Sequence, residues 1–329
     1  MKHKEQMNNN LAPIVLFVYN RPWHTEQTLN ALMQNEQALE STLYIYCDGV
    51  KENSTEDQRQ KIIDVRNVIR TKKWCKEVYI IESEFNKGLA DSIIQGVSEV
   101  LSKHAKVIVL EDDLVTSKYF LVYMNSGLEY YKYKKTVYSI SADRPAYNLF
   151  QIPEDYEYDV FVSLRSYSYG WATWIDRWEC VDWSLDSIVE YLNKPYLMQA
   201  FNRGGEDLNK MLIMQRDNKI DSWAIRFVFA HFMNHAVAIL PCISYIDNIG
   251  CDGSGIHSGE KGLSYRKDTS LATKYPSFLD VLYEDKRIIN SFYSAYYPKK
   301  RPVWKKMMNR ICRILRGKNI FIIKKKVYN

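Results

Sequence analysis

Residues 107–113 read Val-Ile-Val-Leu-Glu-Asp-Asp, four apolar residues followed directly by three acids. A short run of Val, Ile and Leu that ends abruptly in charge is typical of a buried parallel strand whose carboxyl end reaches a ligand-binding crevice. Three neighbouring carboxylates repel one another, and a site this rich in oxygen favours a hard divalent cation. The stretch therefore indicates a metal site that holds a phosphate. The alternative is a strand that ends in a solvated acidic turn.

The residues before this stretch alternate between apolar runs and helical patterns. Helices are expected to begin near Thr25, Ser54 and Asn86, and strands are expected at Ile14–Tyr19, Leu43–Cys47 and Val78–Ile81. Strands and helices that alternate with short connections predict an α/β fold, with a mostly parallel sheet covered by helices on both faces.

Polar residues follow three of these strands at the point where each strand ends. In parallel sheets, ligands bind beyond the carboxyl ends of the strands, and these ends share one edge. We therefore expect one ligand to be surrounded by Asn20, Arg21, Asp48, Glu111, Asp112 and Asp113. This shared edge favours the metal–phosphate interpretation over the solvated turn.

The second half of the chain has a different character. Residues 168–174 read Ser-Tyr-Gly-Trp-Ala-Thr-Trp, and a glycine-dense loop covers residues 248–257. Between them an apolar segment, expected to be helical, covers residues 224–238. We expect one domain over residues 12–298, in which residues 12–115 and 116–298 form two halves of different character.

Composition excludes several classes of protein. No apolar run reaches the length of a membrane-spanning helix, and the first residues lack the apolar core of a signal peptide. The six cysteines form no Cys-x-x-Cys pair, which argues against a zinc site and a dense disulfide framework. A cytoplasmic setting is the simplest expectation.

The last residues differ in charge from the rest. Residues 299–329 hold 12 Lys or Arg and no acid, which leaves 33 basic and 39 acidic residues in 1–298. Basic and apolar residues alternate there near the helical period, so a basic amphipathic tail on an anionic membrane surface is expected. A solvated tail, or one docked on a partner, is the alternative. Nucleic acid is not expected as a partner, because the rest of the chain is acidic.

The motifs, taken in their order along the chain, resemble those of GT-A glycosyltransferases. These enzymes have a Rossmann-like fold and transfer a sugar from a nucleotide donor. The most similar are bacterial enzymes close to family-2 transferases and to N-acetylglucosaminyltransferase I. The resemblance covers residues 12–258 and implies that 12–115 is a nucleotide-binding half and 116–298 an acceptor half. It implies that the donor is bound by Asn20, Arg21, Asp48, Asn86, Lys87, Gly88, Glu111 and Asp112.

The resemblance also implies a metal ion, Mn²⁺ or Mg²⁺, held by Asp113. A divalent cation stabilises the charge that gathers on the leaving diphosphate. In several such enzymes a late histidine completes the metal ligands, and His257 stands at the matching place. The alternative is a loop histidine without this role.

The remaining resemblances concern the acceptor. Asp221 lies in a segment similar to the one that supplies the catalytic base, although Ser222 stands where the family has a second acid. Asp221 is our first candidate for the base and Asp176 the second. The alternative is that Asp221 caps the helix that follows it. Gly170, Trp171 and Trp174 resemble an acceptor-side loop. The two indoles could stack on a sugar, or they could be part of the core.

The implied activity is metal-dependent transfer of a hexosyl or N-acetylhexosaminyl group, with inversion, from a nucleotide sugar such as a UDP-sugar. The acceptor is expected to be a glycan or a lipid-linked glycan in surface polysaccharide biosynthesis, at the inner face of the membrane. The alternatives are a sugar nucleotidyltransferase and a non-catalytic carbohydrate-binding subunit at the membrane.

Overall fold

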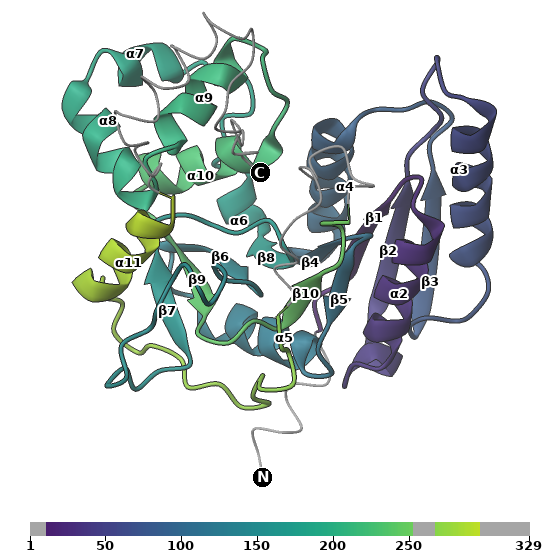
Figure 1. Ribbon diagram of the computed structural model, residues 1–329, viewed down its shortest axis with the longest axis horizontal. Coiled ribbons are helices and arrows are strands. Elements are labelled where there is room, and N and C mark those ends of the chain that lie inside the picture. The colour runs from purple at the N-terminus through teal and green to yellow at the C-terminus, as the bar shows by residue number, and fades with distance from the viewer. Residues whose placement is uncertain (1–10, 253–266, 297–329) are drawn as a thin grey trace, which may run out of the picture.

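The computed structural model describes residues 11–252 and 267–296 (Figure 1). His257 and the basic tail at 299–329 lie outside the described residues, so the expectations for them stay predictions. Within the described part of the chain, none of the helices has the length and apolarity needed to cross a membrane.

A central sheet organises the molecule (Figure 1). Its strand order is β3-β2-β1-β4-β8-β6-β9-β7, and β7 and β8 run antiparallel to their neighbours. The carboxyl ends of the other six strands therefore share one edge, the carboxyl edge. The strands are β1 (Ile14–Val18), β2 (Thr42–Cys47), β3 (Glu77–Glu82), β4 (Lys106–Glu111), β6 (Val137–Ser141), β7 (Val160–Ser163), β8 (Trp171–Trp174) and β9 (Val237–Pro241).

Helices pack on both faces of this sheet, which confirms the predicted α/β class with a mostly parallel sheet. One face is covered by α2 (Pro22–Met33), α3 (Glu56–Val68) and α5 (Phe120–Tyr130). The other is covered by α4 (Leu89–His104), α6 (Ile175–Trp178) and α10 (Trp223–Met233). Further elements are α7 (Ile188–Leu192), α8 (Pro195–Phe201), α9 (Leu208–Arg216), α11 (Lys286–Tyr296), the short helices η2 (Ala38–Glu40) and η3 (Asn202–Gly204), and a two-stranded sheet of β5 (Leu114–Thr116) and β10 (Ile246–Asn248).

The apolar part of β4 is buried from both sides, as its sequence predicts. Ile108 and Leu110 pack into the core on the α2 and α5 face, whereas Val107 and Val109 pack into the core on the α4 face. Successive side chains of a strand point to opposite faces, so only a strand covered twice needs an unbroken apolar run. The apolar run ends at Glu111, where the strand reaches the carboxyl edge.

A buried histidine in α10 makes stability depend on pH. His231 lies with Nδ1 2.7 Å from the Phe227 carbonyl oxygen and Nε2 2.8 Å from Ser139 Oγ, and burial lowers the pKa of His231 to about 4. The unfolded chain takes up this proton near pH 6.5, so stability is lost as the pH falls from there towards 4. We expect His231 to account for a loss of about 2 kcal/mol between pH 7.5 and pH 5.

Urea unfolding of the wild type and His231→Gln at both pH values measures this loss. The variant should be less stable at pH 7.5 and should lose less on acidification. His235→Gln, a change at an exposed histidine, serves as the control. Equal losses in the wild type and His231→Gln would contradict the assignment.

Candidate functional site

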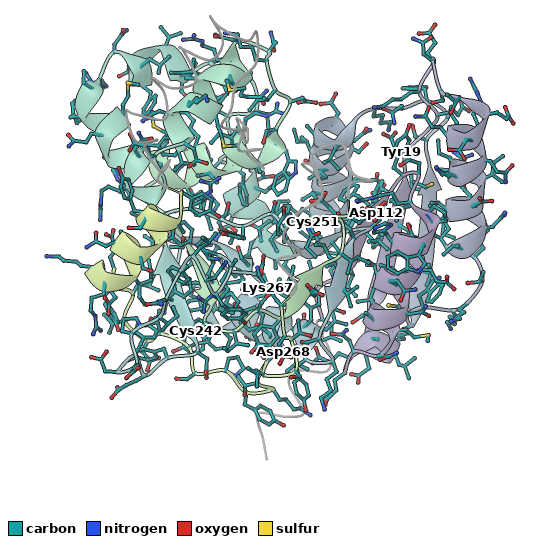
Figure 2. The ribbon with its side chains drawn as sticks, in the orientation of Figure 1. Tyr19, Asp112, Cys242, Cys251, Lys267 and Asp268 are labelled. Carbon is teal, nitrogen blue, oxygen red and sulfur yellow. The ribbon has the colours of Figure 1, made fainter. Side chains whose placement is uncertain are left out.

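The polar residues predicted to meet at the carboxyl edge do meet there. Arg21 follows β1 and begins α2, and Asp48 follows β2. Asp112 and Asp113 follow β4, which pairs with β1 in parallel. Figure 2 shows Asp112 at this edge, with Tyr19 on the neighbouring strand end.

Arg21 forms ion pairs with both aspartates. Its guanidinium contacts Asp112, and its Nη1 lies 3.0 Å from Oδ2 of Asp113. The three side chains are only 17%, 7% and 15% exposed, so water screens these charges poorly. Burial alone would lower the pKa of Arg21, but the charges of Asp112 and Asp113 raise it above its ordinary value. Arg21 is therefore held as a cation between two carboxylates.

One cation does not balance the three acids. Burial, together with the charges of Asp113 and Asp112, raises the pKa of Glu111 to about 8. Burial also raises the pKa of Asp112, although Arg21 opposes this effect. Each carboxylate disfavours ionisation of the next, because buried like charges repel. The end of β4 can therefore accept further positive charge.

The main chain around this cluster is fixed by the first turns of α2. The Thr25 amide and hydroxyl both donate to the Arg21 carbonyl oxygen at 2.9 Å. Thr28 Oγ1 donates to the Asp112 carbonyl oxygen at 2.9 Å. These bonds hold the main chain of Arg21 and Asp112. They do not restrain the guanidinium, which can still move by rotation about the side-chain bonds of Arg21.

A distant segment covers the cluster from the other half of the chain. β10 pairs antiparallel with β5, which begins directly after Asp113, and the Ile249 amide donates to the Asp113 carbonyl oxygen at 2.9 Å. A Cβ on Gly250 would lie 2.0 Å from Oδ2 of Asp113, so a side chain at this position would displace the Asp113 carboxylate. Two residues on, Oδ2 of Asp252 lies 3.1 Å from Nε2 of His24 in α2.

The side chains at the end of β4 fit a divalent metal ion in part. Asp112 and Asp113 offer the carboxylate oxygens that Mg²⁺ and Mn²⁺ prefer, and Oδ2 of Asp113 lies against Gly250 and the guanidinium of Arg21. Among the residues that the structure describes, no group of three or more His, Cys, Asp or Glu side chains forms a complete metal site. A metal bound here would take its other ligands from a phosphate or water.

Asp48 organises the neighbouring loop. Its carboxylate accepts hydrogen bonds from the amides of Gly49 and Lys87 at 2.8 and 2.9 Å, from Asn86 Nδ2 at 2.8 Å and from the Gly88 amide at 3.2 Å. The structure thus brings the predicted donor-binding residues Asp48, Asn86, Lys87 and Gly88 together. The carboxylate oxygens of Asp48 therefore fix the shape of the loop that precedes α4.

Asp221 lies at the same edge of the sheet. α10 is followed by β9, so the helix begins at the carboxyl edge, where α4 also begins. Oδ1 of Asp221 is 3.3 Å from Nη2 of Arg226, and the charges of Asp221 and of Asp91, in the first turn of α4, both act on Arg226. The carboxylate of Asp221 is 63% exposed.

The helix cap proposed as an alternative for Asp221 belongs to the next residue. The Ser222 hydroxyl accepts from the Ile225 amide at 3.4 Å, which makes Ser222 the N-cap of α10. The capping interpretation of Asp221 is therefore wrong, and its carboxylate is left for another role.

Asp176 does not join this site. β8 runs antiparallel to β4 and pairs Trp174 with Lys106, the first residue of β4. Asp176 follows β8 and so lies at the opposite edge of the sheet, where it forms ion pairs with Lys135 and with Arg177. Its expected role as a second candidate base has no support in the geometry.

The predicted acceptor platform is part of the core. Trp171 is 1% exposed, and its ring lies 4.7 Å from that of Trp223 and 5.5 Å from that of Trp178. Trp174 is also buried and carries the Arg177 guanidinium 4.3 Å from its ring centre. Neither indole offers a free face to a sugar, so the stacking interpretation is wrong. Gly170, with φ of 63°, packs against Phe120 and Ala142.

The structure adds polar residues that the sequence interpretation missed. Asp143 follows β6 at the carboxyl edge, accepts a hydrogen bond from Ser244 Oγ at 2.7 Å and forms an ion pair with Lys267. The Lys267 amide donates to Oδ1 of Asp247 at 2.9 Å, and Figure 2 shows Lys267 beside β10. Asp143 follows the parallel strand β6, so the rule that ligand-binding residues follow parallel strands could have found it.

The sequence matches no protein-family model and no curated protein sequence. Among solved structures, a mannosyltransferase from Pyrobaculum calidifontis in complex with GDP-Man and Mn²⁺ aligns with 13% identity and a TM-score of 0.35, over 51% of this chain and 46% of that one. S. aureus TarS 1-349 aligns with 12% identity and a TM-score of 0.38, over 71% of this chain and 59% of that one.

UDP-glucose pyrophosphorylase complexed with UDP-glucose aligns with 11% identity and a TM-score of 0.35, over 70% of this chain and 90% of that one. The chain thus spans less than two thirds of the length of the first two proteins. TM-scores below 0.5 do not support a conclusion about function. The function of this chain is therefore argued from its own side chains.

Proposed function

We propose that the chain is a metal-dependent glycosyltransferase that uses a nucleotide-sugar donor. The observation that carries this proposal is the acidic end of β4, where Asp112 and Asp113 meet Arg21 at the carboxyl edge of a mostly parallel sheet. Crevices at this edge bind ligands in open α/β folds. The loop held by Asp48 and the exposed carboxylate of Asp221 lie at the same edge.

One group of residues would act on the donor and another on the acceptor. Asp113, with Asp112 beside it, would hold the metal, and the metal would supply positive charge to the diphosphate that leaves with the nucleotide. Arg21 would bind the diphosphate of the donor, and the Asn86–Gly88 loop, held in shape by Asp48, would orient it. Asp221 would take the proton from the acceptor hydroxyl, with Arg226 orienting its carboxylate.

The finer assignments follow from the sequence. A UDP-sugar is proposed as the donor, and a hexosyl or N-acetylhexosaminyl group as the one transferred, with inversion. A glycan or lipid-linked glycan in surface polysaccharide biosynthesis is proposed as the acceptor. The basic residues of 299–329 support a peripheral position at the inner face of a membrane.

Ligand-induced stabilisation tests the donor class. The purified full chain is heated with UDP, GDP and their sugars, with and without Mn²⁺, because a ligand of the folded state raises the melting temperature. Stabilisation that needs both nucleotide and Mn²⁺, followed by slow hydrolysis of the sugar donor, supports the proposal. Synthesis of a nucleotide sugar from a nucleoside triphosphate would identify a nucleotidyltransferase. Absence of any nucleotide binding would favour a carbohydrate-binding subunit.

Asp221→Asn is expected to lower kcat by about 10² to 10⁴-fold, because a positioned general base contributes that much to a proton transfer. Binding of the donor, measured by calorimetry, should be unchanged. Asp217→Asn, which alters an exposed acid paired with Arg216 and Lys219, is the matched control and should keep its activity. Turnover of Asp221→Asn close to that of the wild type would remove Asp221 from this role.

A further inference from the structure

Arg21 stands in the place that a metal bound to Asp113 would take. Its Nη1 lies 3.0 Å from Oδ2 of Asp113, and its other terminal nitrogen contacts Asp112. A Cβ built on Gly250 would lie 2.0 Å from that same Oδ2 and 2.9 Å from Nη1 of Arg21. The carboxylate oxygen, the guanidinium and the main chain of Gly250 are thus in mutual contact.

We propose that Arg21 is an internal counter-ion that competes with the divalent cation for Asp112 and Asp113. On metal binding, the guanidinium leaves Asp113 and turns towards the anion that the metal carries. This inference rests on the proposed function, because it takes Asp113 as a metal ligand.

Competition follows from the space and the charges. An oxygen that touches a guanidinium on one side and the Gly250 main chain on another has little room for a third neighbour. Two cations on one poorly screened carboxylate would also repel each other strongly. The metal and the guanidinium therefore exclude each other at Oδ2 of Asp113.

The exchange requires only a side-chain movement. The Arg21 carbonyl oxygen is held by two bonds from Thr25, and Pro22 fixes the backbone at the start of α2. The guanidinium stands at the end of a flexible chain and can rotate away without moving the helix. A released guanidinium at the carboxyl edge suits a phosphate, which it can bind through two parallel hydrogen bonds.

Removal of the Arg21 charge should increase the affinity of the site for the metal. Without the Arg21 charge, Asp112 and Asp113 remain as poorly solvated carboxylates that lack a partner. The metal-free protein should then lose stability, and the metal should bind more tightly because it displaces no cation. If Arg21 merely shaped the site, its removal would weaken metal binding.

The experiment measures Mn²⁺ binding to the full chain in the absence of nucleotide, by the electron paramagnetic resonance signal of free Mn²⁺. Arg21→Gln should bind Mn²⁺ at least about tenfold more tightly than the wild type, a change of about 1.4 kcal/mol. Arg21→Lys keeps the charge and should stay within about threefold of the wild type. Arg70→Gln removes the same charge from the ion pair with Glu82 on β3 and should leave the affinity unchanged.

Melting temperatures give a second measurement. In EDTA, Arg21→Gln should melt below the wild type, and Mn²⁺ should raise its melting temperature by more than it raises that of the wild type. Folding of Arg21→Gln that depends on Mn²⁺ would also support the inference, whereas failure to fold with saturating Mn²⁺ would overturn it.

Asp113→Asn separates the inference from the proposed function. If this change leaves Mn²⁺ binding intact, the proposed metal site is wrong. If it abolishes binding while Arg21→Gln binds Mn²⁺ as the wild type does or more weakly, the metal site stands and the counter-ion role of Arg21 is wrong.

Discussion

Asp113→Asn is expected to lower kcat for sugar transfer by at least about 10³-fold, or about 4 kcal/mol of transition-state stabilisation. The asparagine keeps the size of the side chain and removes the charge that would hold the metal. The negative charge that develops on the leaving diphosphate would then lose its strongest compensation. Steady-state kinetics at saturating donor and Mn²⁺ measure the loss.

The loss should come from chemistry and not from unfolding. Asp113 lies beyond the carboxyl end of β4, and its carboxylate contacts Arg21 rather than the apolar core. Asp57→Asn alters an exposed acid paired with Lys61 in α3, and it should retain full activity as the matched control. A fall of less than about tenfold in Asp113→Asn would contradict the role of this residue in holding the metal.

Trp171→Ala is expected to lower the free energy of unfolding by about 3 to 5 kcal/mol, the usual result of truncating a buried Trp. Its ring stacks between Trp178 and Trp223 beneath α10 and is 1% exposed. The cavity left behind would weaken the contact between the sheet and α10. Urea unfolding followed by circular dichroism measures the change.

The same variant decides between the core and a sugar platform. Trp23→Ala, which truncates an indole that is 57% exposed, should change the stability by less than about 1 kcal/mol and serves as the control. A Trp171→Ala protein as stable as the wild type, with a raised KM for the acceptor, would restore the platform interpretation.

The strands that carry the site could be predicted from their amino-acid composition. β1, β2, β3 and β4 are each a short apolar run that ends in polar residues, and the parallel pairing brings those ends together. The same rule would have found Asp143 after β6. The contact between Arg21 and Asp113 could not be predicted, because it depends on where one flexible side chain settles.

The errors arose where the strand direction changes. β8 is antiparallel within an otherwise parallel region, so Asp176, in the short helix α6 that follows it, falls at the edge opposite to Asp113. The aromatic residues of β8 resemble an exposed loop in sequence, but both faces of this inner strand are covered. A single sequence gives no direct signal for the direction of such a strand.

The pairing of β10 with β5 also has a consequence for biosynthesis. It joins Leu114–Thr116, made early, to Ile246–Asn248, made when most of the chain has left the ribosome. Contacts between such distant segments close late in folding. A nascent chain therefore carries Arg21 and Asp113 long before Gly250 can cover them. The approach of Gly250 to Arg21 and Asp113 should therefore be among the last steps in the folding of a newly made molecule.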